Sequence, residues 1–335
     1  NSPHHMTRYK HSFGYKWQNT VAITPDSRYC LSGDNDGVIT IWGLEKGEML
    51  RQLRGHTDSV NGLAISLDGR RAVSASKDQS LIVWDLQCDK AIHTLYGHTD
   101  EIQAVVVTND GCRAISGGDD ETVRIWDLEL GKELATLRGH KHSVDSIMIT
   151  PDSRTAISGS FRTLRFWDLQ SFTAVRVLQD PSLSASSLAI TPDGQWLLAN
   201  TVDSQIQVWN IEQGVVANVF EGHGESITSI VVSSDGHQAL SASIDNTIKF
   251  WDLSRLDTPS LLPSHTNEVR AVAITPNGQR AVSVSLDKTL MVWDVPHTTE
   301  VCTIAKSKAQ LRAAVVTPDG HFAITGAADR SLRQW

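Results

Sequence analysis

The feature that most constrains the fold is a tryptophan that returns at a nearly fixed interval along the 335 residues. It closes an apolar run at eight positions, namely Trp42, Trp84, Trp126, Trp167, Trp209, Trp251, Trp293 and Trp335. The interval is 42 residues throughout, except for 41 between the third and the fourth. Self-similarity at such a period is typical of solenoids, propellers and other repeat arrays. We therefore expect eight copies of one supersecondary unit.

The copy between Gly55 and Asp85 shows the unit clearly. Its sequence is GHTDSVNGLAISLDGRRAVSASKDQSLIVWD, in which turn residues separate three short apolar runs. A fourth run, from Lys90 to Leu95, precedes the next Gly-His pair. Short runs of this kind joined by Asp-Gly turns indicate antiparallel strands. Each copy therefore predicts one four-stranded antiparallel sheet.

The copies also share a signature, with Gly-His before the first run in four of them and Trp-Asp after the third run in five. Eight in-phase copies of this unit resemble the WD-repeat (WD40) β-propeller family, over about residues 17–335. The even spacing is similar to that of bacterial WD-repeat arrays fused to signalling domains. The resemblance implies an all-β fold, an eight-bladed β-propeller of four-stranded antiparallel blades. A seven-bladed ring with one copy outside it is the alternative.

The last copy stops at Trp335, before any fourth strand. A ring must be closed, because otherwise it leaves unpaired strand edges. We therefore expect residues 7–13 to supply the missing outer strand, so that the N- and C-terminal strands share one blade. Residues 1–6 fit no repeat and are interpreted as a cloning remnant, which leaves residues 7–335 as a single propeller domain.

Three polar residues recur with the tryptophan. Asp stands six positions before it in seven copies, Ser or Thr ten positions before it in most, and His 28 positions before it in four. The resemblance implies a structural tetrad in which Asp accepts from His, His bonds Ser, and Ser accepts from the indole N–H. Complete sets are His56, Ser74, Asp78 and Trp84; His98, Ser116, Asp120 and Trp126; His223, Ser241, Asp245 and Trp251; His265, Ser283, Asp287 and Trp293.

His, Ser and Asp are also the residue types of a hydrolase triad. A catalytic triad occurs once, whereas this set recurs in copy after copy, and no GxSxG elbow accompanies it. The pair His140-x-His142 is the nearest approach to a metal spacing, and His140 already belongs to its own repeat pattern. No Walker or GxGxxG stretch occurs. We therefore expect no catalysis, no metal and no cofactor.

A partner-binding face follows from the resemblance. In the family, the residues three and five positions after the His, and the residue before the turn Asp, point to the top of the ring. Carried over, the positions on which we base the partner site are Trp17, Asn19, Asn35, Asn61, Lys77, Glu101, Gln103, Asp119, Asp145, Val202, Ile244, Glu268, Arg270, Leu286, Gln310 and Arg312. The same pattern selects Ser59, Ser143, Ser160, Ser184, Ser186, Ser226, Thr228 and Ala328.

These positions differ from copy to copy while the strands keep their pattern. The third and fourth copies are acidic here, the seventh and eighth bring Arg270 and Arg312, and Val202, Ile244 and Leu286 form an apolar arc. Our hypothesis is that a partner segment crosses this face, with its apolar group on the arc and its basic part toward the acidic copies. A solvated rim with scattered hydrophobic residues is the alternative.

Composition bounds the partner and the compartment. The net charge is −8 without a Lys/Arg cluster, so a nucleic-acid partner is not expected. No apolar stretch is long enough to span a bilayer. The four cysteines lie in different copies without CxxC spacing, which favours a reducing, cytoplasmic location. We expect a monomeric domain with a protein or peptide partner and no membrane contact.

The function predicted from these observations is a non-catalytic interaction scaffold or sensor. By analogy with the bacterial arrays, it would be the C-terminal sensing or docking part of a larger signalling protein. A free-standing scaffold subunit of eukaryotic type is a second interpretation. A propeller enzyme is a third.

Overall fold

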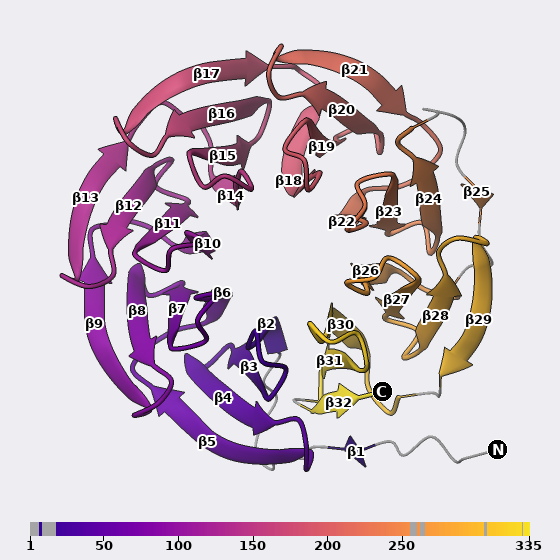
Figure 1. Cartoon of the computed structure of the whole chain (residues 1–335), viewed down its shortest axis with the longest axis horizontal. Coiled ribbons are helices and arrows are strands. Elements are labelled where there is room, and N and C mark those ends of the chain that lie inside the picture. Colours follow the sequence, from indigo (N-terminus) through magenta and orange to yellow (C-terminus); the bar gives the residue numbers. More distant parts are fainter. Residues whose placement is uncertain (1–6, 9–17, 255–259, 262–264, 305–306, 330) are drawn as a thin grey trace.

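The computed structural model describes residues 7–8, 18–254, 260–261, 265–304, 307–329 and 331–335. They form eight sheets of four antiparallel strands, arranged in a ring (Figure 1). The predicted eight-bladed, all-β propeller is confirmed, and the seven-bladed alternative is wrong. None of the described residues belongs to a helix that could cross a membrane. Residues 1–6, interpreted from the sequence as a cloning remnant, lie outside these ranges.

The blades are numbered along the chain, and in each the first strand lies nearest the ring axis (Figure 1). Blade one contains β2 (Gln18–Ile23), β3 (Tyr29–Asp34), β4 (Val38–Gly43) and β5 (Glu48–Arg54). Blade two contains β6 (Val60–Ile65), β7 (Arg71–Ser76), β8 (Ser80–Asp85) and β9 (Lys90–Tyr96). Blade three contains β10 (Ile102–Val107), β11 (Arg113–Gly118), β12 (Val123–Asp127) and β13 (Lys132–Leu137). Blade four contains β14 (Val144–Ile149), β15 (Thr155–Ser160), β16 (Thr163–Asp168) and β17 (Thr173–Gln179).

The second half of the ring repeats this order. Blade five contains β18 (Leu183–Ile190), β19 (Trp196–Thr201), β20 (Ile206–Asn210) and β21 (Val215–Phe220). Blade six contains β22 (Ile227–Val232), β23 (Gln238–Ser243), β24 (Ile248–Asp252) and β25 (Ser260–Leu261). Blade seven contains β26 (Val269–Ile274), β27 (Arg280–Ser285), β28 (Leu290–Asp294) and β29 (Thr299–Ile304). Blade eight contains β30 (Leu311–Val316), β31 (Ala323–Ala327), β32 (Leu332–Gln334) and β1 (Thr7–Arg8).

The ring is closed by the two ends of the chain. β1 pairs antiparallel with β32, placing Thr7 opposite Gln334 and Arg8 opposite Arg333. The prediction that N- and C-terminal strands share a blade is therefore confirmed, while residues 9–13 of the predicted segment lie outside the described part. Pairing across the last blade removes the open edges that an incomplete ring would expose.

The core lies between neighbouring blades. The second and third strands of a blade are buried on both faces, which explains their nearly continuous apolar runs. Trp126 of blade three, for example, packs in one cluster with Val73, Leu81 and Leu95 of blade two. Each blade therefore covers the next, and a single four-stranded unit could not bury this surface alone.

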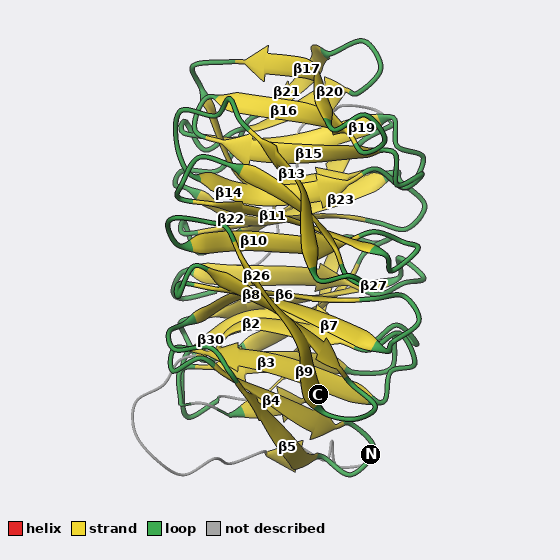
Figure 2. Cartoon of the chain, turned by 90° about the vertical axis from the view of Figure 1, so that its left-hand side faces the viewer, coloured by secondary structure: helices red, strands yellow, loops and turns green. Residues whose placement is uncertain are grey.

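The strands run between two loop-bearing faces (Figure 2). One face carries the turns between the first and second strands, where Gly69 and Gly111 both have a φ of 68°, as hairpin chemistry requires. There Thr108 donates to Asp110 across 2.5 Å, and the other blades repeat this contact. The opposite face carries the Gly-His loops and the turn aspartates at the Asp78 position, and is called the top face below.

Candidate functional site

Blade three shows how the four recurring residues contact one another. His98 Nε2 lies 2.7 Å from Ser116 Oγ, and His98 Nδ1 lies 2.9 Å from the Asp120 carboxylate. The indole N–H of Trp126 donates to Ser116 Oγ across 2.8 Å. The corresponding contacts in blades two, six and seven measure 2.7–3.0 Å. The structure thus brings together all sixteen residues of the four complete sets.

The acceptor of each set shows where its imidazole carries a proton. The Asp120 carboxylate can only accept, so His98 Nδ1 bears a proton and donates it to Asp120. Ser116 Oγ accepts from Trp126 and lies within hydrogen-bond distance of His98 Nε2. Ser116 is completely buried, so its hydroxyl is out of reach of a substrate. In these blades the Ser-His-Asp set can stabilise a sheet but is not arranged to act as a nucleophile.

A fifth residue completes the network, and the sequence analysis missed it. Thr122 donates to Asp120 Oδ1 across 2.8 Å and lies 3.4 Å from His98 Nδ1. Ser80, Thr247 and Thr289 do the same in the other complete blades. Burial raises the pKa of Asp120, but His98, Thr122 and the Thr99 amide together hold that pKa below its usual value. A hydroxyl residue four positions before the tryptophan in six copies was the available signal.

Blade five satisfies its tryptophan by a different network. Trp209 donates to Gln207 Oε1 across 3.1 Å, and the Gln207 amide donates to Asp180 Oδ2 across 3.1 Å. Asp180 stands in the loop before the blade, whereas Asp203, at the usual turn position, is exposed. Ala199 takes the place of the serine. A carboxylate is therefore retained, but it comes from another loop.

The side chains predicted to face a partner are positioned by β-bulges. In seven blades the register between the first two strands shifts by one residue, at the position five after the His. The residues within these shifts are Asn19, Asn61, Gln103, Asp145, Thr228, Arg270 and Arg312. A bulge leaves one residue unpaired and re-aims its side chain. The bulge therefore gives each of these seven blades one variable residue at the same place.

The other two predicted positions of a blade are joined through the backbone. The residue before the turn Asp donates its N–H to the carbonyl of the residue three after the His, at 2.8–3.0 Å. These pairs are Lys77 with Ser59, Asp119 with Glu101, Ile244 with Ser226, Leu286 with Glu268, and Ala328 with Gln310. In blade five Val202 donates instead to Ser182. Of the remaining positions, Trp17 lies outside the described residues, and Asn19 is described only by its place in β2.

Several predicted residues link one blade to the next. Lys77 of blade two forms an ion pair with Glu101 of blade three at 2.6 Å. Asn61 donates to the carbonyl of Ile102 across 3.1 Å, and Ser59 lies 3.5 Å from Asn35 of blade one. These contacts give the residues a structural role in addition to any role in binding.

The acidic part of the face lies at blades three and four. Asp119 accepts hydrogen bonds from Gln103 at 3.0 Å and from Ser143 at 2.5 Å, and Ser143 also lies 2.7 Å from Asp145. Burial raises the pKa of Asp145, and the nearby negative charge of Asp119 raises it further. Two carboxylates of adjacent blades thus lie within hydrogen-bond distance of one hydroxyl. Their negative charges are therefore close together on this side of the ring axis.

The basic part lies at blades seven and eight, across the ring axis (Figure 1). Arg270 forms an ion pair with Glu268. Burial lowers the pKa of Arg312, and the charge of Arg270 lowers it further. Of the apolar arc, Val202 is 49% exposed, whereas Ile244 and Leu286 are half-buried. The arc therefore offers less apolar surface than the sequence suggests.

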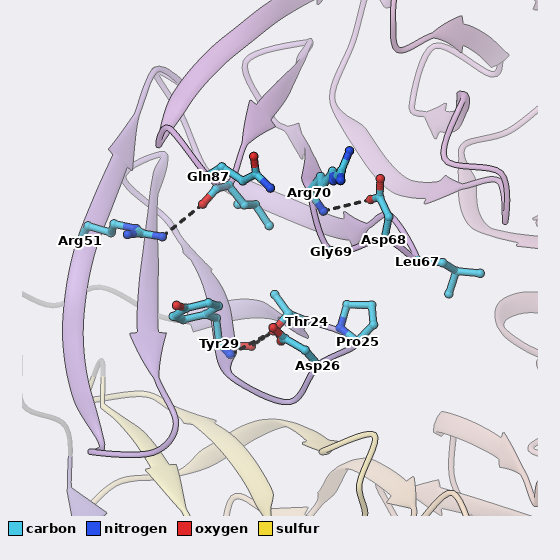
Figure 3. Close-up of a pocket in the computed structure, with 11 residues that line it drawn as sticks. Thr24, Pro25, Asp26, Tyr29, Arg51, Leu67, Asp68, Gly69, Arg70 and Gln87 are labelled. Atoms are coloured by element: carbon cyan, nitrogen blue, oxygen red, sulfur yellow. Dashed lines mark hydrogen bonds between the residues drawn. The ribbon is translucent and has the colours of Figure 1, made fainter.

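A hollow of about 630 Å³ lies on the face opposite the top face, between blades one and two. Figure 3 shows Tyr29 and Arg51 on one side of it and the turn at Leu67 and Asp68 on the other. Its polar groups are engaged locally, since Arg51 donates to the carbonyl of Leu86 and Asp68 accepts from the Arg70 amide. Across the described part of the chain, no three His, Cys, Asp or Glu residues gather as metal ligands.

Comparison with known proteins agrees with this architecture. The family model described as WD domain, G-beta repeat matches residues 7–43, 47–85, 89–127, 131–168, 172–210, 214–252, 257–294 and 296–335. The chain is 42% identical over 41 residues to Transducin-like enhancer protein 2 of Mus musculus, and 44% identical over 41 residues to Protein groucho of Drosophila melanogaster. Each match covers 12% of the chain and only 5% and 6%, respectively, of those proteins.

Proposed function

The chain belongs to the WD domain, G-beta repeat family, and from that premise we propose that it is a non-catalytic scaffold or sensor that binds a protein or peptide on its top face. The observation that carries this proposal is the set of bulges. In seven of the eight blades they place one residue at an equivalent position, and those residues differ around the ring. A rigid ring with variable side chains at fixed positions suits recognition.

The charges of the top face suggest how a partner would lie. Asp119 and Asp145 are on one side of the axis, and Arg270 and Arg312 are on the other. A segment with a basic part and an apolar group would place the basic part at the acidic blades and the apolar group beside Val202. Half-buried Ile244 and Leu286 would add contact area without a large exposed patch, which is typical of a transient interface.

The cellular setting of this scaffold is also a proposal. We infer a cytoplasmic, monomeric propeller spanning residues 7–335, with neither nucleic acid nor membrane as partner. The even spacing of the copies favours the sensing or docking part of a larger bacterial signalling protein. The matches to Protein groucho and Transducin-like enhancer protein 2 favour the alternative, a scaffold subunit of eukaryotic type, but extend over a length close to one repeat.

A matched pair of double variants tests the placement of the site. Arg270→Ala with Leu286→Ala alters the top face, and Arg70→Ala with Leu67→Ala makes the same chemical change on the opposite face, where both residues are exposed. We expect the first pair to abolish affinity capture of the partner and the second to leave it intact. Thermal unfolding of both variants shows whether a lost partner reflects lost structure. Capture that survives the first pair and fails with the second would place the site on the opposite face.

A further inference from the structure

The top face of blade four has a turn that is one residue shorter than in its neighbours. Ser160 Oγ donates to the carbonyl of His142 across 3.1 Å, as Ser76 of blade two donates to Asp58 across 3.0 Å. Arg162 has a positive φ of 62°. The residue that follows the turn Asp in other blades also has a positive φ, for example 69° at Gln79. Phe161 alone therefore occupies the place of two residues, and the turn carboxylate is missing.

The rest of the blade-four network is intact. His140 Nε2 lies 2.6 Å from Ser158 Oγ, and Trp167 donates to the same oxygen across 2.8 Å. Among the described residues the Ser158 hydroxyl has no acceptor other than His140 Nε2, so its proton points to that atom. Burial lowers the pKa of His140, so the ring is neutral and its own proton is on Nδ1. His140 is only 6% exposed, and its Nδ1 has no hydrogen-bond partner. A buried donor left without an acceptor loses its hydration and gains nothing in return.

A second donor in the same blade is also without a partner. Arg165, two residues before the tryptophan, donates through Nη2 to the carbonyl of Gly139, but its buried Nε has no acceptor. In blade three the Nε of the equivalent Arg124 lies 3.9 Å from Asp120 Oδ2 and likewise has no hydrogen-bond partner, so there the turn carboxylate is an ionic neighbour of Nε and not its acceptor. In blade eight the equivalent Arg333 donates to Asp329 across 2.9 Å. His140 and Arg165 are thus the two groups that face a turn carboxylate in other blades.

A cavity of about 450 Å³ lies beside the short turn, lined by Lys141, Arg162 and Thr163 together with the end of β17 and the loop before blade five. His140 Nδ1 is buried and does not line this cavity, so a ligand reaches that atom only when the turn at Phe161 and Arg162 moves. Asp180 also lines this cavity, but its carboxylate accepts hydrogen bonds from Ser182 and Gln207. The cationic side chains of the lining therefore outnumber the acidic one.

An aromatic group lies at the mouth of this position. Phe161 is 37% exposed, with the Arg162 guanidinium 4.8 Å from the centre of its ring. The ring of His142 meets it edge-on at 5.3 Å. A peptide that brought an acidic side chain here would also find an apolar surface for its neighbouring residue.

We propose that blade four binds an acidic residue of a partner peptide, whose carboxylate takes the place of the missing turn Asp. The carboxylate accepts the Nδ1 proton of His140 and approaches Nε of Arg165, while Lys141 and Arg162 supply long-range attraction. His140 Nδ1 gains an acceptor, and the positive charge of Arg165 beside it favours a carboxylate over the amide of the same shape. This site uses neither the apolar arc nor the bulged arginines, so it stands or falls separately from the proposed top-face partner site.

The imidazole resonances of the whole chain provide a direct test. Unlabelled Ac-Gly-Asp-Gly-NH₂ is titrated into ¹⁵N-histidine-labelled protein, with Ac-Gly-Asn-Gly-NH₂ as the matched neutral probe. We expect the His140 ring signals to shift saturably with the Asp peptide only, and those of His98, whose acceptor is already present, to stay in place. A shift of equal size with the Asn peptide, or none with the Asp peptide, would overturn the proposal.

Two variants, one further peptide and acetate sharpen the result. Replacing Phe161-Arg162 with the Lys-Asp-Gln of blade two supplies the carboxylate within the chain, and should abolish the response of His140 to the peptide and raise the melting temperature. Lys141→Gln keeps both buried donors and should weaken binding about tenfold. An unchanged response in both variants would contradict the proposed position. Ac-Phe-Asp-Gly-NH₂ should bind more tightly than acetate, because its Phe side chain can contact Phe161. Equal binding by acetate would overturn the assignment to a partner peptide.

Discussion

Blades four and five both depart from the repeat, yet they leave their buried donors in different states. Blade five has neither the histidine nor the serine, but Gln207 links the Trp209 indole to the carboxylate of Asp180. Blade four keeps His140 and Ser158 and lacks only the carboxylate, so two donors remain without an acceptor. A blade that keeps more of the recurring residues is therefore not always the one with better hydrogen bonding. What matters is whether each buried donor has an acceptor.

Blade three provides the reference for this comparison, since its network is complete and well buried. Its tryptophan contributes packing as well as one hydrogen bond, while its Asp120 contributes only polar contacts. Separate substitutions can therefore measure packing and hydrogen bonding independently. The tryptophan substitution in blade four then tests whether the packing differs there, and the turn-aspartate substitution in blade five tests whether the hydrogen bonding differs.

The largest effect is expected from removing a tryptophan. Trp126→Ala in blade three and Trp167→Ala in blade four should each lower the free energy of unfolding by about 3–5 kcal/mol, because both indoles are almost fully buried and each leaves a large cavity. Urea unfolding of the purified variants measures this. Equal losses would show that packing is the same in the two blades. A much smaller loss at Trp167 would show that the missing carboxylate also loosens the core.

A smaller effect is expected from removing the turn carboxylate. Asp120→Ala should lower the free energy of unfolding by about 1–3 kcal/mol, because it leaves His98 Nδ1 without an acceptor, as in blade four. Asp203→Ala is the matched control, since Asp203 occupies the same repeat position in blade five but is exposed. It should change stability by less than about 0.5 kcal/mol. Equal losses of unfolding free energy in the two variants would show that the contribution of Asp120 does not depend on its hydrogen bond to His98.

The period of the tryptophans predicted eight copies of one four-stranded sheet, and the resemblance to the WD-repeat family, carried by the Gly-His and Trp-Asp pairs, implied that these sheets form a propeller. The period also indicated the strand that closes the ring, although only Thr7 and Arg8 of it are described. The bulges at residues such as Asn61 and Arg270 could not be predicted, because a one-residue shift leaves no mark in the apolar pattern. The Gln207–Asp180 link was equally hidden, since it joins side chains 27 residues apart whose repeat positions carry no such pair in the other copies.

The smallest effect separates blade four from blade three by pH. Burial, together with the charge of Arg165, lowers the pKa of His140 from its ordinary 6.5 to about 3. Between these values the unfolded chain binds a proton at His140 that the folded chain does not, so stability falls as the pH falls from 6.5. The lowered pKa of Asp120 has a different window, because its contribution is present above about pH 4 and is lost only as the pH falls below it.

His140→Gln should therefore reduce the loss of stability between pH 6.5 and 5.5 by about 1 kcal/mol, the linkage expected of one group over one pH unit. Some slope will remain, since burial also lowers the pKa of His265. Urea unfolding at pH 7.5, 6.5 and 5.5 gives the slope of the unfolding free energy against pH. The slopes are compared, and not the absolute stabilities, because the substitution also changes packing. His142→Gln, in the same loop but exposed, should keep the wild-type slope. A wild-type slope in His140→Gln would mean that His140 already has an acceptor when folded, and that blade four is as well satisfied as blade five.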